Sequence, residues 1–273
     1  MINLLVALPA EARPLIHHFK LNGLPAVAGF RRYGNDQITL LITGVGPVAM
    51  ASGVTVLGMQ AAPSNDAWIN LGVAGHRSLP LGSSLLATKI TDAGSGLCWY
   101  PPQVVAAEIE RGELLTLARP AQQYPAVAAV EMEASGFYST ACRFASGELV
   151  QCLKVISDNR QQPVEQLDEE LISRRMVELI EPLNRLIEAL GTLLESRPAE
   201  VEVASERRAY LQAWRFSHAQ EIQLDRLLTD CRLLEGAVPP VSEFSQQTTA
   251  KSLLAALAAR LQTLRLNYSL SKS

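Results

Sequence analysis

The chain has 273 residues, of which 48% are hydrophobic and 19% charged, so it can bury a sizeable core and is not disordered throughout. The net charge of −3 provides no general attraction to nucleic acid or to an anionic membrane. The four cysteines have no CxxC spacing and no neighbouring histidine, so we expect buried thiols instead of disulfides or a zinc site. These cysteines are Cys98, Cys142, Cys152 and Cys231.

The uncharged stretch 37–65 is long enough to be compared with a membrane span. It is interrupted by Gly44, Gly46, Pro47, Gly53 and Gly58, which favour a strand, a turn and a buried helix. The N-terminus lacks a basic region and its apolar run Leu4–Leu8 is short, unlike a secretory signal. We therefore expect a cytoplasmic protein that binds neither membranes nor nucleic acid.

The first two-thirds of the chain alternates strand-like and helix-like segments. Apolar and β-branched runs predict strands at 2–8, 38–43, 67–71, 84–90, 126–130 and 149–156. Helices are predicted at 10–20, 134–144 and from the turn 44–47 to about Gln60, and a glycine-rich turn is predicted at 72–75. Uncharged strands that alternate with helices imply a sheet covered on both faces, so we expect an α/β domain over residues 1–195.

From Leu167 onward the pattern is helical, and Pro182 is expected to start or kink a helix. After a proline-containing break at 196–199, two amphipathic helices are predicted at 201–234 and 248–266. The apolar stripe of the second one consists of Leu253, Leu254, Leu257, Leu261 and Leu264. We expect residues 200–273 to form a helical C-terminal extension without catalytic groups, whose leucines are covered by the α/β domain or by a second subunit.

Acidic residues and glycine-rich turns follow five of the predicted strands, where open α/β sheets bind ligands. They are Glu11, Gly44-Val45-Gly46, Gly72-Val73-Ala74-Gly75, Glu131-Met132-Glu133 and Ser157-Asp158. Each has a structural explanation that is favoured when the segment is taken alone: a helix N-terminus for Glu11, a tight turn for the glycines, an exposed helix start for the glutamates and a cap for Asp158. Their common position at strand ends favours a binding site.

Five segments resemble, in order, the motifs of the nucleoside phosphorylase/nucleosidase superfamily, with the methylthioadenosine/S-adenosylhomocysteine nucleosidases as the most similar branch. The segments are residues 7–11, 43–47, 70–75, 130–134 and 156–158. The resemblance covers about residues 1–195, and its most specific parts are Val-Glu-Met-Glu-Ala and Ile-Ser-Asp. It implies a mixed central sheet flanked by helices, and cleavage by water of the N-ribosidic bond of a purine nucleoside or a 5′-substituted adenosine. No metal ion or other cofactor is expected.

The resemblance also implies a role for each matched residue. Asp158 would protonate or hydrogen-bond the purine N7, Glu11 would activate the attacking water, and Glu133 would hold ribose hydroxyls. A positioned acid or base typically contributes about 10²–10⁴-fold to the rate. The remaining substrate-binding residues would be Gly44, Val45, Gly46, Ala74, Gly75, Glu131, Met132 and Ser157.

Departures from the family pattern leave the reaction open. Val73 and His76 replace a hydroxyl residue and a glycine in the usual turn, and His76 could contact a ligand or be structural. Asn70 stands where phosphorolytic relatives commonly have an arginine that anchors phosphate. Because Glu11 is present as a candidate base for activating water, hydrolysis is favoured over phosphorolysis. Phosphorolysis, with phosphate as a second ligand, remains an alternative because the chain offers four arginines that could bind phosphate: Arg13, Arg31, Arg32 and Arg77.

The interval 92–130 is shorter, by about a helix and a loop, than the corresponding interval in the family. The segment that lines the purine pocket in the family is not visible in this sequence. Residues 114–118 occupy that place, and Trp99 or Tyr100 could stack on the base or pack in the core. Beside a phosphorylase, the alternatives are a non-catalytic nucleoside-binding protein of the same fold and a scaffold organised around the helical extension. A homodimer or another homo-oligomer is expected.

Overall fold

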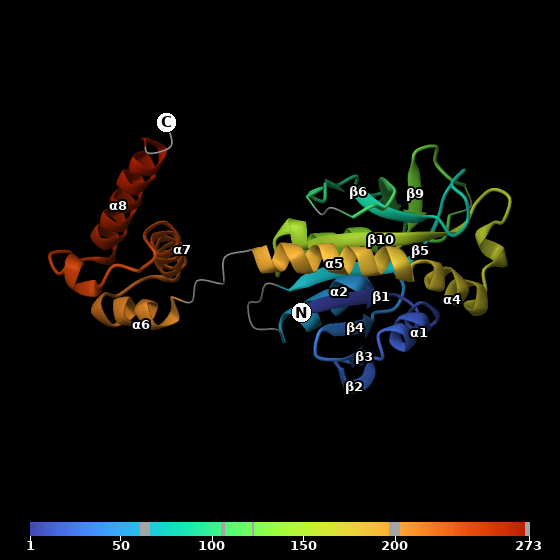
Figure 1. Cartoon of the computed structure of the whole chain (residues 1–273), viewed down its shortest axis with the longest axis horizontal. Coiled ribbons are helices and arrows are strands. Elements are labelled where there is room, and N and C mark those ends of the chain that lie inside the picture. The colour runs from blue at the N-terminus through green and yellow to red at the C-terminus, as the bar shows by residue number, and fades with distance from the viewer. Residues whose placement is uncertain (61–65, 105–106, 122, 197–202, 271–273) are drawn as a thin grey trace. The chain divides into compact units, whose positions relative to one another are not determined.

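The computed structural model describes residues 1–60, 66–104, 107–121, 123–196 and 203–270 (Figure 1). The chain divides into two compact units, Met1–Arg197 (unit 1) and Pro198–Ser273 (unit 2). No helix in these described ranges is long and apolar enough to cross a membrane.

Unit 1 is built on a mixed sheet of ten strands, which confirms the predicted α/β class. The strands are β1 (Ile2–Val6), β2 (Asn22–Val27), β3 (Phe30–Gly34), β4 (Ile38–Ile42), β5 (Ala67–Gly75), β6 (Ser84–Asp92), β7 (Cys98–Trp99), β8 (Arg111–Thr116), β9 (Ala128–Glu131) and β10 (Val150–Asp158). Their order is β10-β6-β8-β9-β5-β1-β4-β3-β2, with β7 on β6. Strand β10 also pairs with β5, so β5, β10, β6, β8 and β9 close into a ring of paired strands.

Helices cover both faces of this sheet (Figure 1). They are α1 (Pro9–His18), α2 (Pro47–Gly58), α3 (Ala134–Ala141), α4 (Glu169–Glu178) and α5 (Ile180–Ser196). Because successive strand residues point to opposite faces, Leu4 and Val6 of β1 pack in the core under α1, α4 and α5, whereas Leu5 packs in the core under α2 and α3. Pro182 lies in the first turn of α5, as expected from its missing N–H group.

The sequence predicted a turn at the glycine-rich segment 72–75, and this prediction is wrong: the segment is the end of β5. Gly72 pairs with Lys154 and Gly75 with Asp158 of the parallel strand β10. A Cβ atom at Gly72 would lie 2.7 Å from Glu11 Oε1, and one at Gly75 would lie 2.4 Å from Asp158 Oδ2. The glycines therefore allow two carboxylates to approach the strand closely.

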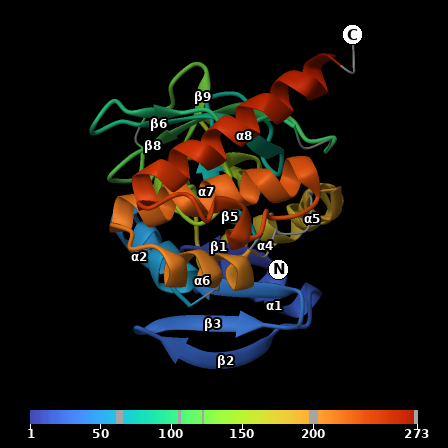
Figure 2. The same cartoon turned by 90° about the vertical axis from the view of Figure 1, so that its left-hand side faces the viewer.

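The sequence did not predict β2, β3, β7 or β8. Strands β2 and β3 form a hairpin at the sheet edge (Figure 2), in which β2 is largely exposed and β3 partly buried, so they lack the apolar runs that marked the other strands. Their turn is Ala28-Gly29, both with positive φ, +47° and +85°. Strand β8 takes up part of the segment 114–118, which stands at the approximate place of the family's purine-lining segment.

Unit 2 consists of α6 (Ala204–Ala213), α7 (His218–Glu235) and α8 (Ala250–Leu270). The predicted helix 201–234 is thus two helices, because Ser217 caps α7 in a capping box with Gln220. Leu253, Leu254, Leu257 and Leu261 are buried within unit 2 itself, against α6, α7 and Phe244. The prediction that the α/β domain or a second subunit covers this stripe is therefore wrong.

Two of the four cysteines also differ from the prediction. Cys152 and Cys231 are buried, but Cys98 and Cys142 are exposed, and all four are free thiols. Cys98 lies in the short strand β7, and Cys142 is the residue that caps the C-terminal end of α3.

Candidate functional site

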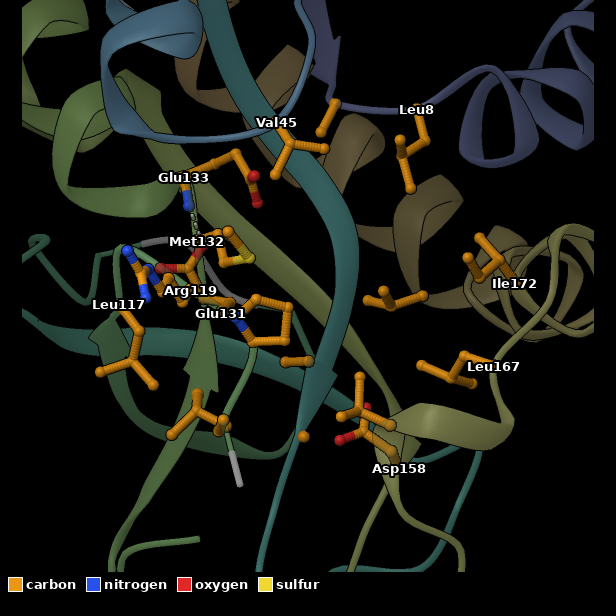
Figure 3. A pocket seen from close by; sticks show the side chains of 18 of the residues that line it. Leu8, Val45, Leu117, Arg119, Glu131, Met132, Glu133, Asp158, Leu167 and Ile172 are labelled. Atoms are coloured by element: carbon orange, nitrogen blue, oxygen red, sulfur yellow. Dashed lines mark hydrogen bonds between the residues drawn. The ribbon is translucent and has the colours of Figure 1, made fainter. Parts of the chain in front are cut away.

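A cavity of about 300 Å³ lies at the carboxyl ends of β1, β5, β9 and β10 (Figure 3). Its charged lining residues are Glu11, Arg119, Glu131, Glu133 and Asp158. The other lining residues are apolar, apart from the main chain: Ala7, Leu8, Val45, Val73, Ala74, Gly75, Leu117, Pro120, Ala121, Val130, Met132, Val164, Leu167 and Ile172. A small apolar pocket with a few converging charged groups is the usual form of a ligand site.

Glu11 lies in the first turn of α1, directly after β1, and is only 3% exposed. Its Oε2 accepts hydrogen bonds from the amides of Ala7 and Leu8, both 2.9 Å long, and its Oε1 accepts one from Val73 N at 3.2 Å. These bonds fix the carboxylate between the β1–α1 turn and β5. They also include the helix-start contact that the structural explanation predicted, so Glu11 both caps α1 and lines the pocket.

Glu133 immediately precedes α3 and is 7% exposed. Its Oε1 accepts a hydrogen bond of 2.9 Å from Gly46 N, the residue that precedes α2. Gly46 has φ +102°, which favours glycine there and lets its amide point toward Glu133. The carboxylate of Glu133 thus connects the starts of two helices, and its Oε2 accepts no hydrogen bond from the part of the chain that the structure describes.

Glu131 and Lys154 form a buried ion pair beneath the pocket, with both side chains fully buried and Nζ 3.1 Å from Oε2. Glu131 Oε2 also accepts from the amides of Glu133 and Ala134, and its Oε1 accepts from the Thr116 hydroxyl at 2.5 Å. Both oxygens are therefore engaged by the protein. Glu131 lines the pocket, but its hydrogen bonds hold the start of α3 and its ion pair holds the lysine.

Burial is the main cause of the shifted pKa values of the glutamates around the single lysine, Lys154. Burial raises the pKa of Glu133 to about 7, against the opposing charge of Lys154 and with the added repulsion of Glu131 and Glu11. Burial also raises the pKa of Glu11, although Lys154 and three backbone amides oppose it. Burial alone would lower the pKa of Lys154, but the glutamates raise it, so the lysine stays charged. A carboxylate with a raised pKa is a better base.

Asp158 ends β10 and is 4% exposed. Its Oδ1 accepts a hydrogen bond of 2.5 Å from the Ser157 hydroxyl, and its Oδ2 accepts one of 2.6 Å from the Tyr124 hydroxyl. Asp158 and Glu133 project from opposite sides of the pocket (Figure 3). A ligand between them can meet one carboxyl group at each end.

The structure places the other predicted substrate-binding residues at or directly behind this pocket. Val45, Ala74, Gly75 and Met132 line it, as do Glu11, Glu131, Glu133 and Asp158. Gly46 and Ser157 reach it through their hydrogen bonds to Glu133 and Asp158. Gly44 supports the neighbouring turn, with φ +88° and its amide donating to Ala7 O at 3.0 Å.

Several other candidates lie elsewhere. His76 is structural: its Nδ1 accepts from the amides of Ser78 and Leu79, and burial lowers its pKa, which keeps the ring neutral. Trp99 packs against the core under α2 and α3, and Tyr100 is 67% exposed, so neither lines the pocket. None of the four arginines considered as phosphate anchors, Arg13, Arg31, Arg32 and Arg77, lines it either.

Sequence reasoning missed Lys154, Tyr124 and Arg119. Lys154 had a detectable signal, since it is the single charge inside the apolar run 149–156. Tyr124 and Arg119 belong to the irregular segment between β8 and β9, where no periodicity indicates which side chains turn inward.

No family model matches the sequence, and no curated protein matches it significantly. Solved structures do match. The MTA/SAH nucleosidase of Streptococcus pneumoniae with 8-aminoadenine has 21% identity and a TM-score of 0.57, covering 69% of this chain and 99% of that chain. The methylthioadenosine nucleosidase of Arabidopsis thaliana has 15% identity and a TM-score of 0.57, covering 72% of this chain and 96% of its own.

A futalosine hydrolase mutant of Helicobacter pylori has 14% identity and a TM-score of 0.56, covering 68% of this chain and 98% of its own. These solved structures are thus matched over nearly their whole length. The part of this chain that matches them is about as long as unit 1. Unit 1 therefore shares the fold of these solved nucleosidases and of the futalosine hydrolase, as the sequence motifs predicted. MTA/SAH nucleosidases are among the proteins that share it.

Proposed function

We propose that unit 1 is a nucleosidase, which uses water to cleave the N-ribosidic bond of a purine nucleoside or a 5′-substituted adenosine. The observation that carries this proposal is the convergence of Glu11, Glu133 and Asp158, from three separate strand ends, on one apolar cavity. The solved nucleosidases of the same fold support the same class of reaction.

The cleaved bond joins sugar C1′ to base N9, and its electron pair leaves with the base. Asp158, at one side of the pocket, delivers a proton to N7 so that the base departs as a neutral purine. Positive charge develops on the sugar at the same time. Glu133, at the other side, stabilises the sugar by accepting hydrogen bonds from the sugar hydroxyls at its Oε2.

Water then adds to C1′ and loses a proton to Glu11. The pKa of Glu11 is raised by burial, and the carboxylate is held rigidly by three backbone amides. Glu131 fixes the start of α3 by accepting hydrogen bonds from the amides of Glu133 and Ala134. Lys154, paired with Glu131, offsets part of the negative charge of the carboxylates around the pocket. The products are the free base and the free sugar, and no cofactor takes part.

Hydrolysis is favoured over phosphorolysis by the lining of the pocket. Asn70, at the position of the anchoring arginine in phosphorolytic relatives, is fully buried and donates to Leu5 O. Among the described lining residues, Arg119 is the cation, and it is exposed at the pocket edge. Four acidic side chains in the same lining disfavour a phosphate ion.

The apolar part of the lining supports a 5′-substituted adenosine as substrate. Leu167 and Ile172 gather on one side of the pocket together with Leu8 (Figure 3). An alkyl or alkylthio group would remove this surface from water, whereas a free 5′-hydroxyl would find no partner there.

Product analysis tests the proposal. The full chain is incubated with 5′-methylthioadenosine, adenosine and inosine, each with and without phosphate. We expect free base and free sugar at a rate that phosphate does not change. Phosphate-dependent release of a sugar 1-phosphate would indicate a phosphorylase, and binding without turnover would indicate a regulatory nucleoside-binding protein.

We also propose that the protein acts in the cytoplasm as a homo-oligomer. An open groove between α2 and α3, which carries the exposed side chains Val48 and Leu97, supports self-association. Light scattering of the full chain checks the oligomeric state, and a monomer would contradict this part of the proposal.

A further inference from the structure

Tyr124 is a buried tyrosine whose hydroxyl reaches the carboxylate of Asp158. It is 9% exposed and lies in the segment between β8 and β9 that also supplies Arg119 and Pro120 to the pocket. Its hydroxyl donates to Asp158 Oδ2 at 2.6 Å, while the Ser157 hydroxyl donates to Oδ1 at 2.5 Å. Both oxygens of Asp158 are therefore held by hydroxyl groups.

The ring of Tyr124 packs against Gly75, which lines the pocket. A Cβ atom at Gly75 would lie 2.5 Å from Tyr124 Cε1 and 2.4 Å from Asp158 Oδ2. Gly75 lines the pocket and pairs with both Val130 of β9 and Asp158 of β10. Only a glycine there leaves room for the ring and the carboxylate together, so the contact is built into the meeting point of three strands.

We propose that Tyr124 is a positioning residue for Asp158, which acts from behind the pocket wall; the proposal rests on the function proposed above. Tyr124 is not among the lining residues, so it orients the carboxyl group without touching the base. Each carboxyl oxygen has two lone pairs, and the bond from Tyr124 leaves the group able to face N7.

The hydroxyl also stabilises the charge that forms on Asp158 during the reaction. When the proton moves from the carboxyl group to N7, negative charge develops on the two oxygens that accept from Tyr124 and Ser157. Hydrogen bonds to a charged acceptor are stronger than hydrogen bonds to a neutral one. The contact is therefore stronger after proton transfer than before it, and this difference accelerates the step.

The test compares Tyr124→Phe with Tyr138→Phe in the full chain. Tyr138 is a buried tyrosine of α3, 5% exposed, that does not line the pocket, so it is a matched control. With 5′-methylthioadenosine, Tyr124→Phe should lower kcat by roughly 10-fold or more, because it removes a hydrogen bond to a charged group, while KM changes little. Tyr138→Phe should keep the wild-type kcat. Both are assayed at a temperature where calorimetry shows them folded.

A double-variant cycle separates positioning from a general structural effect. In the Asp158→Asn background, Tyr124→Phe should cause little further loss, because its partner charge has been removed. An equal loss in both backgrounds, or no loss in either, would overturn the proposal.

Adenine binding, measured by calorimetry on the same four proteins, gives a readout that needs no turnover. Weaker binding to Tyr124→Phe, without further weakening in the double variant, would support the Tyr124–Asp158 coupling even if the wild type cleaves no nucleoside. In that case the proposed function alone would fail. A wild type that neither binds adenine nor cleaves a nucleoside would overturn both proposals.

Discussion

At the scale of residues, the site is a set of carboxylates around one buried lysine. Glu11, Glu133 and Asp158 could be predicted from the sequence, because each follows a strand and stands within a motif. Lys154 stands out in the sequence as the single charge within 149–156, but its ion pair with Glu131 of β9 does not. Tyr124 could not be predicted, since it lies in the irregular segment between β8 and β9. The structure also assigns the oxygens of Glu131 to protein groups, which spacing alone does not show.

Glu133→Gln should weaken activity and improve stability at alkaline pH. The amide makes weaker hydrogen bonds to sugar hydroxyls, so we expect roughly a 10-fold or larger loss in kcat/KM. In the wild type, burial raises the pKa of Glu133 from 4.5 to about 7, so the folded state binds this proton more tightly than the unfolded state. Stability from this group is therefore present below pH 4.5 and is lost as the pH rises to about 7.

Thermal unfolding at several pH values checks this sign. The variant should melt above the wild type at pH 8, and the difference should shrink toward pH 5. Parallel pH profiles of the melting temperature, together with unchanged kinetics, would show that Glu133 is only a residue at the start of α3.

Lys154→Met should destabilise unit 1 strongly. It leaves Glu131 buried and without its counter-ion, and breaking one side of a buried ion pair typically costs about 3–5 kcal/mol. The control is Lys89→Met, which breaks the ion pair of Lys89 with Glu113, also 3.1 Å long but with side chains 31% and 37% exposed. That variant should change the free energy of unfolding little. Equal effects in urea unfolding would contradict the assigned burial.

At the scale of elements, the site depends on how closely α2 and α3 approach each other. A Cβ atom at Gly136 of α3 would lie 2.0 Å from Pro47 O at the start of α2. This contact sets the spacing at which Gly46 N reaches Glu133 Oε1. The sequence predicted most central strands from continuous apolar runs, and both helices, but not this contact. It missed the β2–β3 hairpin because β2 is largely exposed and β3 only partly buried.

Gly136→Ala should therefore impair both stability and activity. Forcing a methyl group against the backbone of α2 should cost about 1–3 kcal/mol and separate the helix starts that hold Glu133. Gly191→Ala is the control, because Gly191 lies inside α5, and apart from its own stretch of helix no described residue has an atom within 4 Å of its Cβ position. Alanine there should stabilise the helix by about 0.5–1 kcal/mol and leave kcat/KM unchanged. Urea unfolding and steady-state kinetics measure both effects, and a harmless Gly136→Ala would contradict the account of the α2–α3 contact.

At the scale of the whole molecule, the chain consists of two units with separate cores. The sequence indicated a helical extension from its leucine spacing, yet it could not show what covers the leucines. They are covered by Tyr210, Leu224, Leu228 and Phe244 of the same unit. Spacing defines an apolar face, whereas its partner depends on tertiary packing.

Truncation after Arg197 should consequently expose none of these leucines. We expect the fragment 1–197 to keep the kcat/KM of the full chain and one of its thermal transitions, because the pocket and both of its flanking cores lie within unit 1. Differential scanning calorimetry and nucleoside kinetics on both proteins check this. A folded but inactive fragment would place a functional residue in unit 2.

The most direct test of the central claim is the rate of base release by Asp158→Asn. The account assigns Asp158 the proton that the departing base requires, and an amide cannot deliver it. With 5′-methylthioadenosine as substrate, the variant should retain the circular dichroism spectrum and melting temperature of the wild type but release adenine at least ~10²-fold more slowly. Adenine release near the wild-type rate by the folded variant would contradict the account.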